Sequence, residues 1–189
     1  NIDDDELTYC KIYPKGSFVE GRDWTCHIVL GTYIQFYEDG VREEYEAERA
    51  AEEQRFEDAY KLYEISAKKG NADAYYQLGE YNYFGKGIEK NEVEAVKWYR
   101  KAAEKGSIYE QVLLRLGDCY YFGQGVEQDQ TEAVNWYRKA AELGHEYAQF
   151  RLGDCYYFGQ GVEQDQKEAV KWYRKAAELG HEYAQFRLG

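Results

Sequence analysis

One short motif in the sequence has the residue types and spacing of a catalytic site. Ser66-Ala67-Lys68-Lys69 matches the Ser-x-x-Lys pattern of serine hydrolases, in which the serine is the nucleophile. The motif falls in the last turn of a predicted helix, and the companion motifs Ser-Asp-Asn and Lys-Thr-Gly occur nowhere in the chain. A basic residue at a helix C-terminus also complements the helix dipole. We therefore expect no catalytic residue, and a weak hydrolase is kept only as an alternative.

Two histidines and two cysteines are residue types that could bind a metal ion or form a disulfide bond. His145 and His181 are 36 residues apart, and so are Cys119 and Cys155. Since packed helices lie about 8–10 Å apart, equivalent side chains on successive helices cannot readily share an ion or a disulfide bond. We expect no metal site and no cofactor, and cysteines that act as small apolar side chains.

Three Gly-x-Gly segments could hold a phosphate group. They are Gly85-Lys86-Gly87, Gly123-Gln124-Gly125 and Gly159-Gln160-Gly161. No strand pattern precedes them, and the third glycine and the Lys-Ser/Thr of phosphate-binding loops are missing. Glycine tolerates a positive φ angle, so every copy is explained as the end of a helix.

The elements that position all these residues recur along the chain. Four glycines mark the period, with spacings of 36, 38 and 36 residues: Gly70, Gly106, Gly144 and Gly180. Each unit contains a first helical pattern, here called helix A (about 147–158), and a second, helix B (about 166–179). Helix B is amphipathic, and Asp165 with Glu168 gives it a capping-box-like start. A Leu-Gly pair inside each helix A indicates close approach of another helix, because an interior glycine costs about 1 kcal/mol relative to alanine.

This pattern resembles the Sel-one-like repeat, a relative of the tetratricopeptide repeat, over about residues 55–189. One full copy consists of Ala148, Leu152, Gly153, Tyr156, Gly159, Gly161, Val162, Asp165, Ala169, Trp172, Tyr173, Lys175, Ala176, Ala177 and Gly180. The resemblance implies an all-α fold, a right-handed α-α superhelical solenoid of antiparallel helix pairs whose helices A line the concave side. One copy departs from the pattern, with Asn82 where tyrosine is expected. Some cysteine-rich relatives have been linked to β-lactam binding or hydrolysis, but here Ala141 and Ala177 stand where their helix B cysteines would be expected.

The repeat divides the chain into segments. We predict an N-terminal capping segment at 1–23, a degenerate first repeat at 24–70, three Sel-one-like repeats at 71–106, 107–144 and 145–180, and a partial fifth repeat at 181–189. The degenerate repeat carries about 12 extra residues without glycine or proline, which predicts one extended second helix over Arg42 to Lys69, about 40 Å long. The capping segment is expected to be irregular or to form a short hairpin over Thr8 to Val19.

The stripe of helix A that the core leaves over is the expected partner-binding site. It consists of Gln77, Glu80, Arg115, Asp118, Tyr147, Arg151, Asp154, Phe158, Tyr183 and Arg187. Arginine and aspartate could bind the polar groups of an extended peptide, and tyrosine offers rigid contact area. In the alternative, Arg151 and Asp154 merely pair along their own helix. The sequence predicts a protein-interaction module or scaffold; the alternatives are a weak hydrolase acting on β-lactam or peptidoglycan-like compounds and a self-assembling solenoid.

Charge and composition narrow the choice of partners. A net charge of −12 disfavours nucleic acid, so we expect a protein or peptide partner, basic or neutral. No apolar run is long enough to span a membrane. The sequence stops halfway through a helix A, an uncapped end through which copies could associate. A cytoplasmic location is favoured; a secreted or periplasmic one, a trimmed start before Asn1 and a Cys10–Cys26 pair stay open.

Overall fold

The computed structural model describes residues 18–19, 22–23, 40–107 and 110–189. The chain divides into two units, 1–39 and 40–189. In the first unit, β1 (Phe18–Val19) pairs antiparallel with β2 (Arg22–Asp23), with Phe18 opposite Asp23. Most of the hairpin expected over residues 8–19 lies outside the described residues, as do Cys10 and Cys26.

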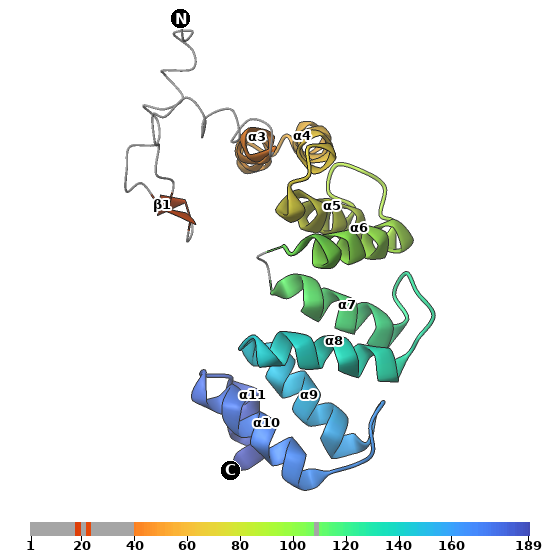
Figure 1. Ribbon diagram of the computed structural model, residues 1–189, viewed down its shortest axis with the longest axis vertical. Helices are drawn as coiled ribbons and strands as arrows, with labels where there is room; N and C mark the ends of the chain where they lie inside the picture. Colours follow the sequence, from red (N-terminus) through yellow and green to blue (C-terminus); the bar gives the residue numbers. More distant parts are fainter. Residues whose placement is uncertain (1–17, 20–21, 24–39, 108–109) are drawn as a thin grey trace, which may run out of the picture. The chain divides into compact units, whose positions relative to one another are not determined.

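The described residues of the second unit form nine helices joined by short turns (Figure 1). They are α3 (Val41–Glu52), α4 (Phe56–Lys68), α5 (Ala72–Phe84), α6 (Glu92–Lys105), α7 (Gln111–Phe122), α8 (Gln130–Glu142), α9 (Glu146–Phe158), α10 (Gln166–Glu178) and α11 (Glu182–Leu188). None of them is long and apolar enough to cross a membrane.

Each helix packs on the next one along the chain. The tightest packing is within the pairs α3–α4, α5–α6, α7–α8 and α9–α10, and α4–α5, α6–α7, α8–α9 and α10–α11 join the pairs. The second unit is therefore the all-α solenoid of helix pairs that the repeat predicts. Alanines and leucines close the layers: Ala74, Ala95, Ala133, Ala148, Ala169, Leu78, Leu116 and Leu152 are fully buried. The small side chains at the alanine positions let neighbouring helices approach closely.

The predicted helix boundaries are confirmed at the turns. Asn91, Asp129 and Asp165 accept hydrogen bonds from the backbone N–H groups of the first turn of helix B. Gly85, Gly123 and Gly159 end helices A with φ angles near +70°, so the Gly-x-Gly segments are helix ends. The second glycine of each turn lies against the backbone at the start of the preceding helix B.

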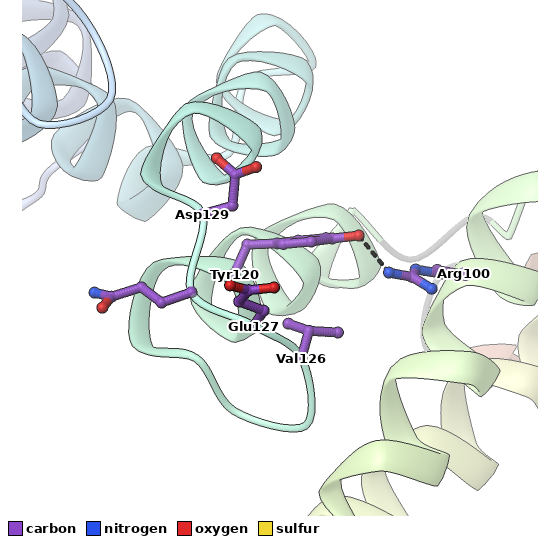
Figure 2. Close-up of a pocket in the computed structure, with 6 residues that line it drawn as sticks. Arg100, Tyr120, Val126, Glu127 and Asp129 are labelled. Atoms are coloured by element: carbon purple, nitrogen blue, oxygen red, sulfur yellow. Dashed lines mark hydrogen bonds between the residues drawn. The ribbon is translucent and has the colours of Figure 1, made fainter.

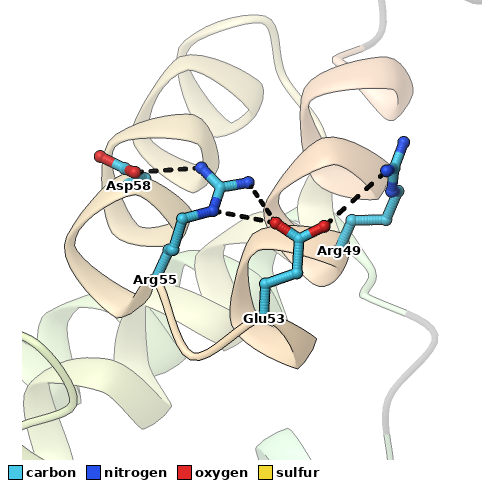
Figure 3. Close-up of polar contacts among 4 residues, drawn as sticks. All are labelled: Arg49, Glu53, Arg55 and Asp58. Carbon is cyan, nitrogen blue, oxygen red and sulfur yellow. Dashed lines mark hydrogen bonds and ion pairs between the residues drawn. The ribbon is translucent and has the colours of Figure 1, made fainter.

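The single long helix predicted over Arg42 to Lys69 is wrong, because the chain reverses between α3 and α4. Gln54 has a φ of 60°, and Arg55 at the N-cap position of α4 makes no side-chain cap. Figure 3 shows that Arg55 instead donates hydrogen bonds to Glu53 at 2.8 and 3.0 Å and to Asp58 at 3.1 Å. These exposed contacts lie at the turn between α3 and α4, which contains no glycine. In this pair α3 packs on α4 as a helix A packs on its helix B.

Polar contacts tie α3 to the end of α4. The Ser66 hydroxyl donates to the Gly40 carbonyl at 2.6 Å, Lys69 pairs with Glu43 at 2.6 Å, and the Asn71 amide donates to Glu44 at 2.8 Å. Whether 24–70 forms one degenerate repeat stays a prediction, since residues 24–39 lie outside the described part of the chain.

The departure at Asn82 is accommodated inside the core. Its side chain is buried, and its amide nitrogen donates to the Leu78 carbonyl at 2.8 Å and to the Tyr60 hydroxyl at 3.2 Å. The buried amide is therefore hydrogen-bonded rather than turned to the surface.

Candidate functional site

The predicted stripe is built around a close contact between a glycine and a tyrosine. A Cβ atom at Gly117 would lie 2.5 Å from the Tyr137 ring, and one at Gly153 would lie 2.7 Å from the Tyr173 ring. Gly79 meets Tyr99 in the same way. The close approach that the Leu-Gly pairs predict is therefore confirmed: the tyrosine of helix B lies directly over the glycine of helix A.

The same tyrosine donates a hydrogen bond to the carboxylate that follows the glycine. Three such bonds join helix B to helix A of its own repeat: Tyr99 to Glu80, Tyr137 to Asp118 and Tyr173 to Asp154, each at 2.7 Å. Burial raises the pKa of all three tyrosines, so their hydroxyls keep the protons that they donate.

An arginine from the next repeat completes each group. Arg115 binds both oxygens of Glu80, at 2.9 and 3.1 Å. Arg151 lies 3.9 Å from Asp118, and Arg187 lies 3.7 Å from Asp154. We call each carboxylate–tyrosine–arginine group a rung. The arginines thus pair with the preceding repeat, and the alternative in which Arg151 pairs with Asp154 on its own helix is wrong.

Side-chain length separates the first rung from the second. Aspartate is one methylene shorter than glutamate, and only the Glu80 rung has two direct arginine–carboxylate hydrogen bonds. Arg151 instead donates to the Tyr137 hydroxyl at 3.2 Å, and its buried Nε has no hydrogen-bond partner. Burial raises the pKa of Asp118, against the opposing effects of the Tyr137 hydrogen bond and the Arg151 charge. The rungs link successive repeats through charged residues for which the sequence predicts partner binding, and that binding stays a prediction.

What the rungs leave exposed is a row of phenylalanine rings at the ends of helices A. We call Phe84, Phe122 and Phe158 the aromatic ladder; they are 48%, 55% and 52% exposed. Each ring lies edge-on to the preceding tyrosine, with ring centroids 4.9 Å apart. The rung arginine that the next repeat supplies lies 5.2 Å from Phe84, 5.2 Å from Phe122 and 5.5 Å from Phe158. The cation holds each ring in place from one side, leaving the remainder open to solvent.

The remaining predicted site residues take other positions. Tyr147 and Tyr183 surround Phe150 and His181 at ring distances of 5.8 to 6.3 Å, and Phe150 also contacts the rung tyrosine Tyr173 at 5.9 Å. Gln77 occupies the position that is arginine in later repeats, so helix α5 supplies no rung arginine to the helix pair before it. Sequence reasoning did not find the donor role of the helix B tyrosines. Their fixed distance of 20 residues from the Leu-Gly glycine was the signal that could have revealed it.

The residues with catalytic or metal-binding types have structural contacts. Ser66 is fully buried with its hydroxyl bonded to Gly40. His145 and His181 cap α9 and α11 by accepting backbone hydrogen bonds at Nδ1. Cys119 and Cys155 are free and buried, and burial raises their pKa to about 12 and about 11. In the described ranges no group of three or more metal-ligating residues gathers.

A surface hollow of about 520 Å³ lies beside the α7–α8 turn (Figure 2). Arg100 from α6 donates to the hydroxyl of Tyr120 and lies 5.5 Å from its ring, and Glu127 and Asp129 flank it. In the next repeat Arg138 donates to Tyr156 in the same way, at 3.0 Å. The contact is a repeated joint between neighbouring pairs, and no residue of the predicted stripe lines the hollow.

The sequence of the chain is similar to known repeat proteins. A family model described as "Sel1 repeat" matches residues 54–71, 72–107, 111–145 and 146–181. A 56-residue part of the chain is 38% identical to the Arabidopsis thaliana ERAD-associated E3 ubiquitin-protein ligase component HRD3A, covering 29% of this chain and 8% of that protein.

Two solved structures share the fold over most of the chain. A protective antigen of uropathogenic Escherichia coli strains with an SLR fold is 30% identical, with a TM-score of 0.75, over 83% of this chain and 34% of that one. A Sel1 repeat protein from Oxalobacter formigenes is 35% identical, with a TM-score of 0.62, over 70% and 52%. The chain thus spans about half or less of the length of each of these relatives.

Proposed function

This chain belongs to the Sel1 repeat family, and on that premise we propose that it is a scaffold that binds an extended segment of a partner protein along the stripe of helices A. Repeats of this family are generally protein-interaction scaffolds. The observation that carries the proposal is the aromatic ladder, which repeats one half-exposed phenylalanine per helix pair. Half-exposed aromatic rings held by neighbouring groups offer contact area at little entropic cost.

The division of labour within the stripe supports this proposal. Glu80, Asp118 and Asp154 are already bonded to tyrosines, and their arginines are drawn back to the preceding repeat. A partner that covers the ladder therefore does not have to bury an unpaired carboxylate or arginine of the rungs, which would weaken binding. In our proposal the rungs position the rings, and Phe84, Phe122 and Phe158 contact the partner.

Site-specific crosslinking tests the proposal. A photo-crosslinking amino acid replaces Phe122 or Phe158 in the full chain, and products from the native source are mapped by mass spectrometry. Matched controls replace Val93 and Val170, which are 55% and 41% exposed but lie on helices B. We expect crosslinks to the same partner segment from both phenylalanine positions and none from the controls. Equal crosslinking from Val93 and Val170 would refute a site on helices A.

Self-association is the second candidate. Sedimentation velocity of the full chain tests it: a dimer supports it, and a monomer at high concentration rejects it. The hydrolase alternative gains no support, because its serine is buried and hydrogen-bonded to the backbone.

A further inference from the structure

The first position of the aromatic ladder carries a charge that the other two lack. Lys86 Nζ lies 5.5 Å from the centre of the Phe84 ring and 5.9 Å from that of Tyr81. The equivalent residues in the next two turns are Gln124 and Gln160, which accept hydrogen bonds from Tyr83 and Tyr121 at 2.8 and 2.6 Å. The ladder is thus asymmetric. The turn after Phe84 carries the ammonium group of Lys86, whereas the turns after Phe122 and Phe158 carry an uncharged glutamine at the same position.

The ammonium group of Lys86 has no acidic partner within the described part of the protein. Lys86 is exposed and forms no ion pair there, whereas Lys90, in the same turn, pairs with Glu92 at 2.8 Å. The neighbouring Arg115 is neutralised by both oxygens of Glu80. In a chain with a net charge of −12, Lys86 is therefore a local exception that would attract an acidic group of a partner to the Phe84 end.

The carboxylates along the ladder do not provide the opposite preference. Glu80, Asp118 and Asp154 each accept a tyrosine hydroxyl and face an arginine, and their side chains are only 12%, 20% and 16% exposed. A basic side chain of a partner would have no free carboxylate to meet there. The overall negative charge favours basic molecules at a distance, but the contacts at the ladder favour apolar ones.

Resting on the proposed function, we propose that the aromatic ladder binds an extended peptide with an aspartate or glutamate side chain at Lys86 and apolar side chains over Phe122 and Phe158. This assigns a polarity and a chemistry to the partner segment. It also differs from the basic partner expected from net charge, because local charges decide what a contact surface accepts.

Selection from a phage-displayed library of random 12-residue peptides tests this proposal. The targets are the full chain, Lys86→Gln, Lys90→Gln and Phe122→Ala. Lys86→Gln recreates the Gly-Gln-Gly turn of the next two repeats, so the fold is retained. Lys90→Gln removes the same charge from the same turn, at a residue that is already paired, and is the matched control.

We expect the full chain to enrich peptides with one acidic residue near one end and apolar residues along the remainder. Against Lys86→Gln the acidic preference should disappear while the apolar preference remains, and Lys90→Gln should select as the full chain does. Phe122→Ala should lose the apolar preference. Peptides enriched without an acidic residue, or with one that persists against Lys86→Gln, would overturn this inference alone. Enrichment that ignores Phe122→Ala, or no enrichment at all, would overturn the proposed function as well.

Binding constants of one selected peptide complete the test. By fluorescence anisotropy, replacing its acidic residue by the amide should weaken binding to the full chain about threefold, as expected for an exposed ion pair. The same replacement should leave binding to Lys86→Gln unchanged. An equal loss for both proteins would show that the acidic residue contacts another group and would reject the proposal.

Discussion

The α3–α4 pair and the pairs from α5 to α10 pack in the same way but are connected by different turns. Gly-x-Gly turns connect the helices of the later pairs, whereas α3 and α4 connect through Glu53, Gln54 and Arg55 without glycine. Ser66 on α4 occupies a position that is Ala102, Ala140 and Ala176 in the repeats. The comparison teaches that burial of small side chains defines the pair, while the turn that connects its helices can differ.

The largest expected effect is at the turn glycines that only the later pairs use. In Gly161→Ala the new Cβ would overlap the Gln130 carbonyl oxygen at a φ of +70°. We expect a loss of about 3 kcal/mol in the free energy of unfolding, measured by urea denaturation, from backbone strain and overpacking. Gly180→Ala, at φ +101° with nothing within 4 Å, is the control and should lose only about 1 kcal/mol. Equal losses would show that the turn contact is dispensable.

Removing a rung hydroxyl should have the next largest effect. Tyr137→Phe deletes the donor to Asp118 and the acceptor for Arg151 while keeping the buried ring. Because the hydrogen bond is to a charged group, we expect a loss of about 2 kcal/mol. Thermal and urea unfolding measure it. If Tyr121→Phe, whose partly buried hydroxyl binds a neutral amide, costs as much, the carboxylate is not the reason.

Removing the Ser66 hydroxyl from the α3–α4 pair should reduce the free energy of unfolding by less than removing the Tyr137 hydroxyl. Ser66→Ala removes the bond to the Gly40 carbonyl, which still accepts from the Glu44 N–H. The expected loss in unfolding free energy is about 1 kcal/mol. A loss as large as that of Tyr137→Phe would contradict the ranking of the two regions. Hydrolysis of a chromogenic β-lactam by the full chain that Ser66→Ala abolished would revive the hydrolase alternative.

Lengthening the carboxylate side chain of the second rung should give that rung the direct arginine–carboxylate hydrogen bonds of the first. Asp118→Glu is expected to restore direct bonds to Arg151 and to stabilise the chain by about 0.5 kcal/mol, since the pair is partly exposed. The reciprocal Glu80→Asp should destabilise it by a similar amount. Differential scanning calorimetry of both variants checks the signs, and two shifts in the same direction would exclude side-chain length as the cause.

The smallest effect concerns the glycine-free reversal between α3 and α4. Gln54 is the only described non-glycine residue with a positive φ, 60°. Gln54→Gly relieves this strain but increases the entropy of the unfolded chain, so the net change should be within about 0.5 kcal/mol. Urea denaturation measures it, with Gln54→Ala, which should be no more stable than wild type, as the control. A stabilisation well above this range would mean that the reversal is strained.

The repeat in the sequence predicted which residues form the candidate site, but it did not predict what each residue contacts. The positions of Arg151, Asp154 and Phe158 on one stripe follow from helical periodicity, which a single sequence reveals. Periodicity along one helix says nothing about the neighbouring helix, so the pairing of Arg151 with Asp118 of the preceding repeat could not be deduced. The half-exposed rings of Phe84 and Phe122 were recognisable as equivalents of Phe158, but their exposure depends on how the arginines lie.

The sequence by itself determined the helix pairs, their caps and their glycine turns, because each depends on residues close together in the chain. Only the tertiary structure decided that residues 41–68 form two helices instead of one, since the reversal at Gln54 carries no glycine or proline signal. It also decided that the charged residues of the stripe link the repeats and that the phenylalanines are left exposed. Those outcomes depend on distances between side chains of different repeats, which no local pattern encodes.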